Sequence, residues 1–270
     1  MQALSDDTFR RVSEIMYESI GLSFGESKKP LISSRLASRI QKIGLPSFEA
    51  YADVLEDQSQ AAEFQMAVVL LTTNETYFFR EPKHYELLEQ ELLARKSRGP
   101  LAIWSAASSF GDEAYSTAML LSDMQRKGQI GPDWSILGTD VSHRVLLSAT
   151  EAVYPQDRLR HVPPEQMQRY CLQGEGRTSG QVMMQHSLRS HVRFGQLNLT
   201  KSIEGIGPFD VVFLRNVLIY FDPPTKIAVV DRVLSTLRPG GLFFMGTAEG
   251  RVACKAPLKA VIPGAYRKLE

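Results

Sequence analysis

The amino-acid sequence predicts an α/β protein in which a small helical domain precedes a parallel β-sheet with helices on its faces. Three observations support this. Apolar residues recur at helical spacing through the first hundred residues. Compact apolar runs then alternate with helical patterns from residue 101 onward, which is typical of a parallel sheet. Between the two halves of that alternation, the glycine-rich stretch 173–195 predicts a small antiparallel β-subdomain.

The N-terminal stretch predicts several short amphipathic helices with a shared core. Two apolar stripes have spacings of three and four residues, and Ser47 is a suitable N-cap for a third helix. The residues expected to be buried are Phe9, Val12, Met16 and Ile20 in the first helix, Leu36, Ile40 and Ile43 in the second, and Tyr51, Val54 and Leu55 in the third.

A further helix is expected after Pro82, ending at the sequence Lys-Ser-Arg-Gly-Pro of residues 96–100. We interpret it as a linker helix. The predicted organisation is therefore an N-terminal helical domain over 1–80, a linker helix over 81–100 and a second domain over 101–270.

The second domain is expected to follow a strand-helix alternation. Pro239, Gly240 and Gly241 end a helix and redirect the chain, and Ala265 and Tyr266 begin an antiparallel edge strand. The expected strands are 101–106, 134–140, 209–216 and 242–247, and the expected helices are 112–128, 142–150 and 224–237.

Composition excludes several classes of protein. The chain has 270 residues with 31 basic and 30 acidic side chains, so its net charge of +1 gives no reason to expect nucleic acid as a partner. No apolar run approaches the roughly 18 residues of a membrane helix, and the first residues do not form a signal peptide, so a cytoplasmic protein is expected. Two distant cysteines and five histidines without ligand spacing predict neither a disulfide framework nor a metal site.

Charge is unevenly distributed in the N-terminal domain. Residues 27–47 contain five basic side chains and no acidic one, whereas 49–63 contain five acidic side chains and no basic one. We expect these two blocks to remain separate in space. Arg35, Arg39 and Lys42 share one helical face, on which solvated surface cations are the alternative to a docking site.

Polar residues at the carboxyl ends of the predicted strands are the first candidates for a site, because ligands bind there in open parallel sheets. Asp140 ends the second strand and is suited to the hydroxyls of a ribose, or alternatively to capping the next helix. The loop after the first strand lacks a GxGxxG pattern and leads to Asp112 and Glu113. These carboxylates disfavour a pyrophosphate and favour a cationic cofactor without phosphate, such as S-adenosylmethionine.

Two further segments carry polar groups among apolar ones. LTTNETYFFREP (71–82) contains Asn74, Thr76 and Arg80, and LRNVLIYFDPPT (214–225) places Arg215, Asn216 and Tyr220 after a buried strand. For each residue alone, a structural role is the alternative.

Taken in order, these strings resemble the CheR chemotaxis receptor methyltransferases. The resemblance runs from LSDDTFRRVSEIMYESIG (4–21) through LTTNETYFFRE, WSAASSFGDEAYS, GTDVS, LNL and FDVVFLRNVLIYFD to LRPGG (237–241). It implies a Rossmann-like class I methyltransferase domain with an inserted antiparallel β-subdomain, S-adenosylmethionine as cofactor, and methyl transfer to glutamate side chains of chemoreceptors. Phe110, Ala114 and the Thr247-Ala248-Glu249 string depart from the family's usual pattern.

The resemblance also implies which residues act. Arg80 and Tyr220 lie nearest the reacting methyl, Asp140 holds the ribose and Glu113 the methionyl ammonium. The implied cofactor pocket consists of Asn74, Thr76, Arg80, Glu113, Asp140, Asn198, Leu199, Arg215 and Asn216.

The implied partner is the helical cytoplasmic bundle of a chemoreceptor, docked on Arg35, Arg39 and Lys42, with the enzyme peripheral to receptor arrays. A receptor C-terminal peptide at the β-subdomain is a second expected partner. Two alternatives remain: a non-catalytic S-adenosylmethionine-binding scaffold and a small-molecule class I methyltransferase.

Overall fold

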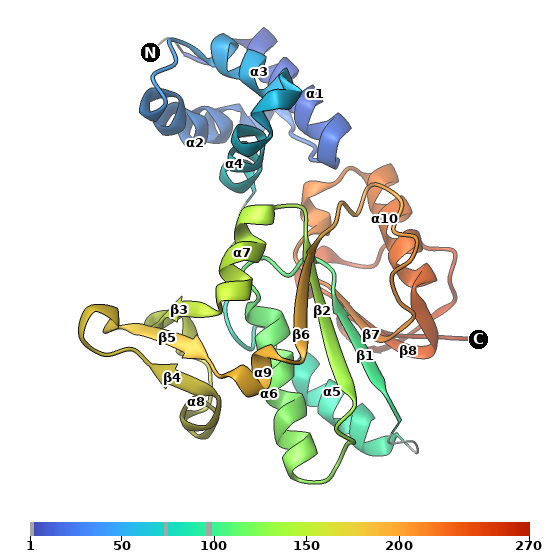
Figure 1. The fold of residues 1–270 in the computed structure, drawn as a ribbon. Helices are drawn as coiled ribbons and strands as arrows, with labels where there is room; N and C mark the ends of the chain where they lie inside the picture. Colours follow the sequence, from blue (N-terminus) through green and yellow to red (C-terminus); the bar gives the residue numbers. More distant parts are fainter. Residues whose placement is uncertain (1–2, 73–74, 96–98) are drawn as a thin grey trace.

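The computed structural model describes residues 3–72, 75–95 and 99–270. Figure 1 shows a helical N-terminal domain above a larger domain built on a β-sheet. Within the described residues, no helix is long and apolar enough to cross a membrane.

The N-terminal domain is a cluster of four helices around one apolar core. The predicted stripe Phe9, Val12, Met16 and Ile20 is buried in that core, and Ser47 Oγ accepts a hydrogen bond from Ala50 N as an N-cap. The helices are α1 (Asp6–Ile20), α2 (Lys29–Lys42), α3 (Phe48–Glu56) and α4 (Ala61–Leu71), with 3-10 turns at Glu26–Lys28 and Gln58–Gln60.

Helix α4 was not predicted from the sequence. Its residues AAEFQMAVVLL are apolar on nearly every side, so the helix has no amphipathic period to detect. It packs against α2 and α3 within its own domain and against α7 (His143–Glu151) of the sheet domain.

The large domain contains a seven-stranded sheet in the order β6-β2-β1-β7-β8-β10-β9. The first five strands of that order are parallel, and β10 pairs antiparallel with both β8 and β9. Strand β9 is therefore outermost, so the strand expected at 265–266 is not the edge. The strands are β1 (Leu101–Ser105), β2 (Trp134–Asp140), β6 (Val192–Gln196), β7 (Phe209–Leu214), β8 (Leu237–Met245), β9 (Leu258–Ile262) and β10 (Ala265–Lys268).

Alternate residues of the central strands enter two separate cores, because successive strand side chains point to opposite faces. Ile103 and Phe213 face a core shared with α5 (Pro82–Ala94) and α6 (Asp112–Arg126). Their neighbours Trp104 and Val212 face a core shared with α10 (Pro223–Ser235), on the other side of the sheet. Strand order reverses between β1 and β7, which places the switch point of the sheet there.

Packing bears on two of the expected domain boundaries. Tyr85, Leu88 and Leu92 of α5 belong to the core of the sheet domain. Phe78 also lies in that core, so packing assigns the segment just before residue 80 to the sheet domain.

The β-subdomain is a separate three-stranded antiparallel sheet in the order β3-β5-β4, seen at the left of Figure 1. It begins before the predicted range, and residues 192–196 instead form β6, parallel to β2 in the main sheet. The helical turn at His186–Arg189 separates QVMM (181–184), which forms a strand of the subdomain, from SHVRF (190–194), which leads into β6 of the main sheet. The elements are β3 (Val153–Pro155), β4 (Cys171–Gln173), β5 (Gln181–Met184), α8 (Pro164–Tyr170), α9 (His186–Arg189) and 3-10 turns at Gln156–Leu159 and Gly176–Thr178.

Candidate cofactor site between the two domains

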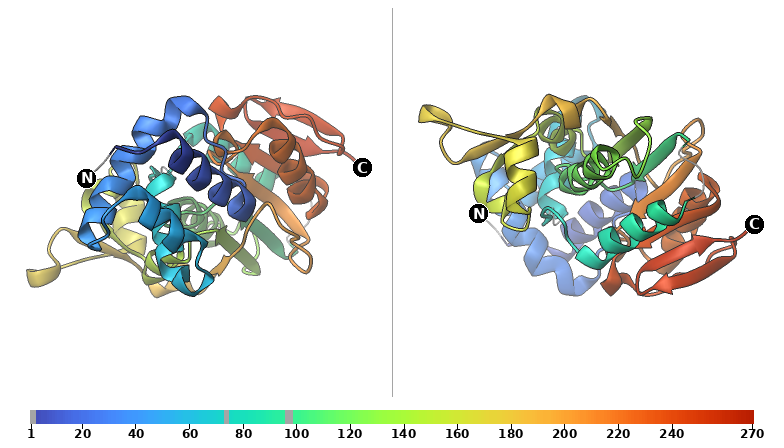
Figure 2. Two further views of the ribbon diagram at one scale, coloured as in Figure 1. Left: turned by 90° about the horizontal axis from the view of Figure 1, so that it is seen from above. Right: turned by 90° about the horizontal axis from the view of Figure 1, so that it is seen from below.

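A cavity lies at the switch point of the sheet. Figure 2 shows the N-terminal domain covering the carboxyl ends of the strands there. The volume of the cavity, including the open mouth, is about 980 Å³. Ile20 and Leu22 contribute to the wall from the N-terminal domain. The remaining lining comes from described residues between 72 and 80, from Tyr85 and Glu113 in α5 and α6, and from the ends of β1, β2, β6 and β7 with the loops that follow them. The site is therefore built by both domains.

The loop after β1 is shaped by backbone conformation. Ser109 and Gly111 have positive φ angles of 49° and 88°, which turn the chain from β1 into α6. A Cβ on Gly111 would stand 3.0 Å from the Phe194 ring and 3.1 Å from Tyr154 Oη, so this position needs glycine for space as well as for φ. The buried hydroxyls of Ser108 and Ser109 have no hydrogen-bond partner within the described chain.

Asp140 ends β2 and lines the cavity. Its Oδ2 accepts a hydrogen bond from Ser109 N at 3.0 Å, and its Oδ1 accepts one from Ser142 N at 3.0 Å. Burial raises the pKa of Asp140, while the backbone donors oppose that shift. Asp140 thus orders the turn before α7, which itself has no side-chain cap. Lone pairs of the same carboxylate remain for a ligand, so the binding of a ribose stays a prediction.

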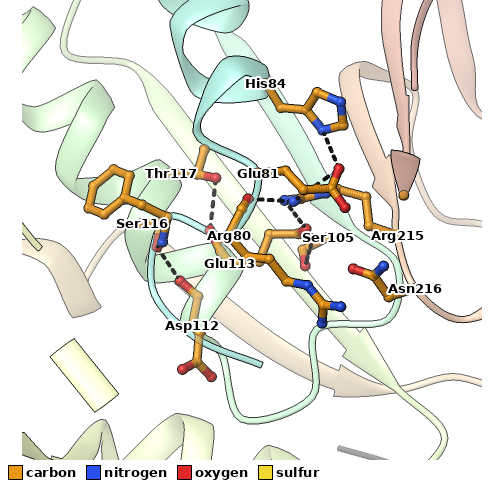
Figure 3. A network of polar contacts seen from close by, with 12 residues as sticks. Arg80, Glu81, His84, Ser105, Asp112, Glu113, Ser116, Thr117, Arg215 and Asn216 are labelled. Carbon is orange, nitrogen blue, oxygen red and sulfur yellow. Dashed lines mark hydrogen bonds and ion pairs between the residues drawn. The ribbon is translucent and has the colours of Figure 1, made fainter. Parts of the chain in front are cut away.

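Glu113 and Arg215 form a buried ion pair at the switch point, with Glu113 Oε2 and Arg215 Nη1 3.0 Å apart (Figure 3). Ser105 Oγ donates to Glu113 Oε1 at 2.6 Å. Burial raises the pKa of Glu113 and the Arg215 charge opposes the shift. Glu113 therefore enters the cavity wall already paired with a cation.

Arg215 is held by three acceptors on the described chain. Besides Glu113, its guanidinium lies 3.5 Å from Glu81 Oε2 and donates to the backbone carbonyl of Arg80. Arg215 Nε is buried and has no hydrogen-bond partner among the described residues. Glu81, which has a left-handed φ of 59°, was missed by sequence reasoning because a lone glutamate after FFR carries no strand-end signal.

Asp112 does not belong to the site, contrary to the expectation that it shares the role of Glu113. It is fully buried and forms a two-pronged pair with Arg158, whose Nε and Nη2 lie 2.7 and 2.9 Å from the two carboxylate oxygens. Consecutive helical residues point about 100° apart, so the two carboxylates of α6 face different surroundings. The Asp112–Arg158 pair thus connects the start of α6 to the 3-10 turn that follows β3 in the β-subdomain.

The loop after β7 is anchored by a second residue that the sequence did not single out as functional. Asn216 has a positive φ of 59°, and its backbone N–H donates to Glu249 Oε2 at 2.9 Å. Glu249 also accepts from Gly246 N at 2.8 Å and from Leu218 N at 2.7 Å. Although the string around Glu249 departs from the family pattern, this carboxylate shapes the wall to which Asn216 belongs.

The loop after β6 ties the two domains together. Asn198 Nδ2 donates to the backbone carbonyl of Ser19 in α1, and its Oδ1 accepts from Thr200 N at 3.0 Å. Leu199 is buried, and both predicted residues of this loop line the cavity.

Four further predicted residues complete the comparison with sequence. Thr76, Arg80 and Tyr220 all line the cavity, whereas Asn74 lies outside the described residues. Arg80 Nη1 donates to the Glu75 carbonyl at 2.7 Å, and its guanidinium carbon lies 5.8 Å from the Tyr77 ring centroid.

The predicted docking residues lie on α2, away from the cavity lining. We expected the basic block 27–47 and the acidic block 49–63 to remain separate in space, and this prediction is wrong at Arg39. Arg39 makes a two-pronged contact with Glu63, which also accepts from Tyr51 Oη at 2.7 Å. Helix α4 brings Glu63 beside α2, a contact that was invisible while α4 itself was undetected.

The residues present fit S-adenosylmethionine. The cavity offers the carboxylates of Asp140 and Glu113, two buried serine hydroxyls and the unpaired Arg215 Nε, with apolar walls such as Val141 and Leu197 between them. Acidic groups match a cationic cofactor with ribose hydroxyls, and the absence of a glycine-rich phosphate loop in 106–111 matches a cofactor without phosphate.

Comparison with known proteins agrees with this site. The model of the CheR methyltransferase SAM-binding domain matches residues 74–260, and that of the CheR methyltransferase all-alpha domain matches residues 7–72. The chain is 38% identical to a chemotaxis protein methyltransferase of Escherichia coli over 248 residues, covering 92% of this chain and 85% of that protein. It is 39% identical to chemotaxis protein methyltransferase 2 of Pseudomonas aeruginosa over 259 residues, covering 94% and 90% of the two chains. The chain therefore belongs to the CheR family of S-adenosylmethionine-dependent methyltransferases.

Proposed function

We propose that this chain transfers the methyl group of S-adenosylmethionine to glutamate side chains of chemoreceptors, forming methyl esters for sensory adaptation. The observation that carries the proposal is the cavity at the switch point, whose lining combines the acidic residues Asp140 and Glu113 with Arg80 and Tyr220. The names of the chemotaxis relatives support the class of substrate.

The reaction places few demands on acid-base groups of the enzyme. A glutamate with an ordinary pKa of about 4.3 is already ionised at neutral pH, so its oxygen attacks without a general base. The bound cofactor supplies a methyl carbon made electrophilic by the adjacent sulfonium. The chain's own task is to align the attacking oxygen with that carbon and to exclude water.

Each polar residue of the cavity has a role in that alignment. Asp140, fixed by Ser109 N and Ser142 N, holds the ribose hydroxyls. The Glu113–Arg215 pair receives the methionyl end, with Glu113 near the ammonium and the unpaired Arg215 Nε near the carboxylate. Arg80 and Tyr220 orient the carboxylate of the substrate.

The remaining cofactor residues shape the pocket around these groups. Asn198 fixes the loop that presents Leu199, and Asn216 holds the turn after β7. Thr76 lines the cavity beside the cofactor, and the family resemblance adds Asn74 to the cofactor-binding residues.

Receptor docking involves the basic face of α2. Lys42 is exposed, and Arg35 shares its face, so these two cations meet the acidic helical bundle of a receptor near its array. Arg39 contributes through its pair with Glu63, which stabilises the domain that presents this face. A receptor C-terminal peptide adds as a strand to the outer edge of β4 in the β-subdomain.

Methyl transfer from labelled S-adenosylmethionine to chemoreceptor-containing membranes tests the proposal. We expect label that is released by mild base, as a carboxyl methyl ester requires, and none with the Arg80→Ala variant. Tight binding of S-adenosylhomocysteine without transfer to any receptor would instead identify a cofactor-binding scaffold. Base-stable label would exclude glutamate as the acceptor.

A further inference from the structure

We propose that Arg160 and His161, after β3, form a recognition site for a second carboxylate of the substrate, adjacent to the glutamate that is methylated. The inference rests on the proposed function and names a further part of the substrate that the enzyme recognises. It is carried by a group of cations gathered around one aromatic ring at the rim of the cofactor cavity.

The ring is that of Tyr77, which lines the cavity together with Arg80. The guanidinium carbons of Arg80 and Arg160 lie 5.8 and 5.9 Å from its centroid, and the His161 ring centroid lies 5.1 Å away. We call Tyr77, Arg80, Arg160 and His161 the Tyr77 cluster. Two arginines contact one ring, although their like charges repel each other when both lie this close to it. A bound anion stabilises such an arrangement.

Arg160 is already oriented for such an anion. Its Nε donates to His161 Nε2 at 3.1 Å, which fixes the plane of the guanidinium. The two terminal nitrogens contact no carboxylate in the described part of the chain, and both Arg160 and His161 are exposed. A planar guanidinium held at Nε, on an exposed side chain, can offer its two terminal nitrogens to the two oxygens of a carboxylate.

The neighbouring arginine of the same turn behaves differently. Arg158 is only two residues away, yet it is committed to the buried Asp112 and stacks on the Phe110 ring at 4.6 Å. Arg158 therefore anchors the turn to α6, and the rigid anchor presents Arg160 at the surface. Arg158 within the 3-10 turn thus has a structural role, whereas Arg160, directly after the turn, is available for recognition.

Geometry limits where the second carboxylate lies on the substrate. The separation of the Arg80 and Arg160 guanidinium carbons does not exceed the sum of their distances to the shared ring, 5.8 and 5.9 Å. Side chains one helical turn apart are about 5–6 Å apart at Cβ, and two turns rise about 11 Å. On a helical substrate, a second carboxylate three, four or seven positions from the methylated glutamate falls within this limit.

The test compares Arg160→Gln with Arg126→Gln, which removes the same charge at the far end of α6. With chemoreceptor-containing membranes as substrate, we expect Arg160→Gln to lower kcat/KM about tenfold, mainly through KM, and to flatten its dependence on salt. S-adenosylhomocysteine affinity, measured by calorimetry, should stay within twofold of the unmodified enzyme for both variants, and Arg126→Gln should retain full activity.

A double-mutant cycle with the substrate completes the test. Neutralising the acidic residues three, four or seven positions from a methylated glutamate should lower kcat/KM of the unmodified enzyme about tenfold. The same change in the substrate should lower kcat/KM of the Arg160→Gln enzyme little. Equal losses for both enzymes, unchanged kinetics in Arg160→Gln, or a parallel loss of cofactor affinity would each overturn the inference. Failure of the unmodified enzyme to methylate receptors at all would instead refute the proposed function.

Discussion

Replacing Glu249 by Gln should weaken both the fold and the cofactor site. The carboxylate accepts three backbone hydrogen bonds, from Asn216, Gly246 and Leu218. A glutamine has one acceptor oxygen, so it retains the pair at Asn216 and Gly246 and turns an amide N–H₂ toward Leu218 N. One charge-assisted bond is worth about 1.5–3 kcal/mol, and an unpaired buried N–H costs about 1–3 kcal/mol. We therefore expect a loss of about 2–4 kcal/mol in the free energy of unfolding.

Denaturant unfolding and calorimetry with S-adenosylhomocysteine measure the two effects. Because Asn216 lines the cavity and holds a positive φ through this contact, cofactor affinity should fall at least about tenfold, which corresponds to 1.4 kcal/mol. Glu204→Gln, on an exposed loop, is the matched control and should change neither quantity. Gly246→Ala gives an independent check, since its Cβ would stand 2.8 Å from Glu249 Oε2. Unaltered affinity in Glu249→Gln, despite the expected loss of stability, would refute the link between this carboxylate and the site.

Three further predictions concern the N-terminal domain, a buried histidine and the reacting centre. Arg39→Glu should lower the melting temperature by placing two carboxylates together at Glu63, whereas Lys42→Glu should reduce only receptor methylation; equal thermal loss in both would contradict this division. Burial and the nearby guanidinium lower the pKa of His84 below its ordinary value of 6.5, so the unfolded chain takes up a proton before the folded chain does. The contribution of neutral His84 to the free energy of unfolding is therefore lost as the pH falls below that value. Between pH 8 and 5, the free energy of unfolding measured with denaturant should decline less for His84→Gln than for the unmodified chain. Arg80→Lys should keep the charge but lose most of kcat, because an ammonium lacks the planar donor pair; near-normal turnover would remove Arg80 from the alignment of the substrate.

Much of the fold was predictable because its strongest signals are local. Strand β2 matches its predicted range, and the buried stripe of α1 follows directly from helical spacing. Helix α4 escaped because it is apolar all round, and the course of the β-subdomain escaped because short strands separated by turns have little periodicity. Local pattern carries no information about which segments meet in space.

The same limit applies to the site. The strand-end rule found Asp140 and Arg215, and Arg80 stood out as a polar residue in an apolar segment; all three line the cavity. Neither approach showed that Glu113 reaches the cavity already paired with Arg215. Neither found Glu249, whose importance comes from three backbone donors brought together by tertiary contacts.

The shared wall of the cavity has a thermodynamic consequence. Ile20 and Leu22 belong to one domain and the strand ends to the other, while Asn198 bonds across the junction to Ser19. A ligand that contacts both sides stabilises the joined arrangement, by about 2.7 kcal/mol at a concentration one hundred times its Kd. Cofactor saturation should consequently slow amide exchange at the end of α1 as well as in the sheet, so that the supply of methyl donor also sets how firmly the N-terminal domain is held against the sheet domain.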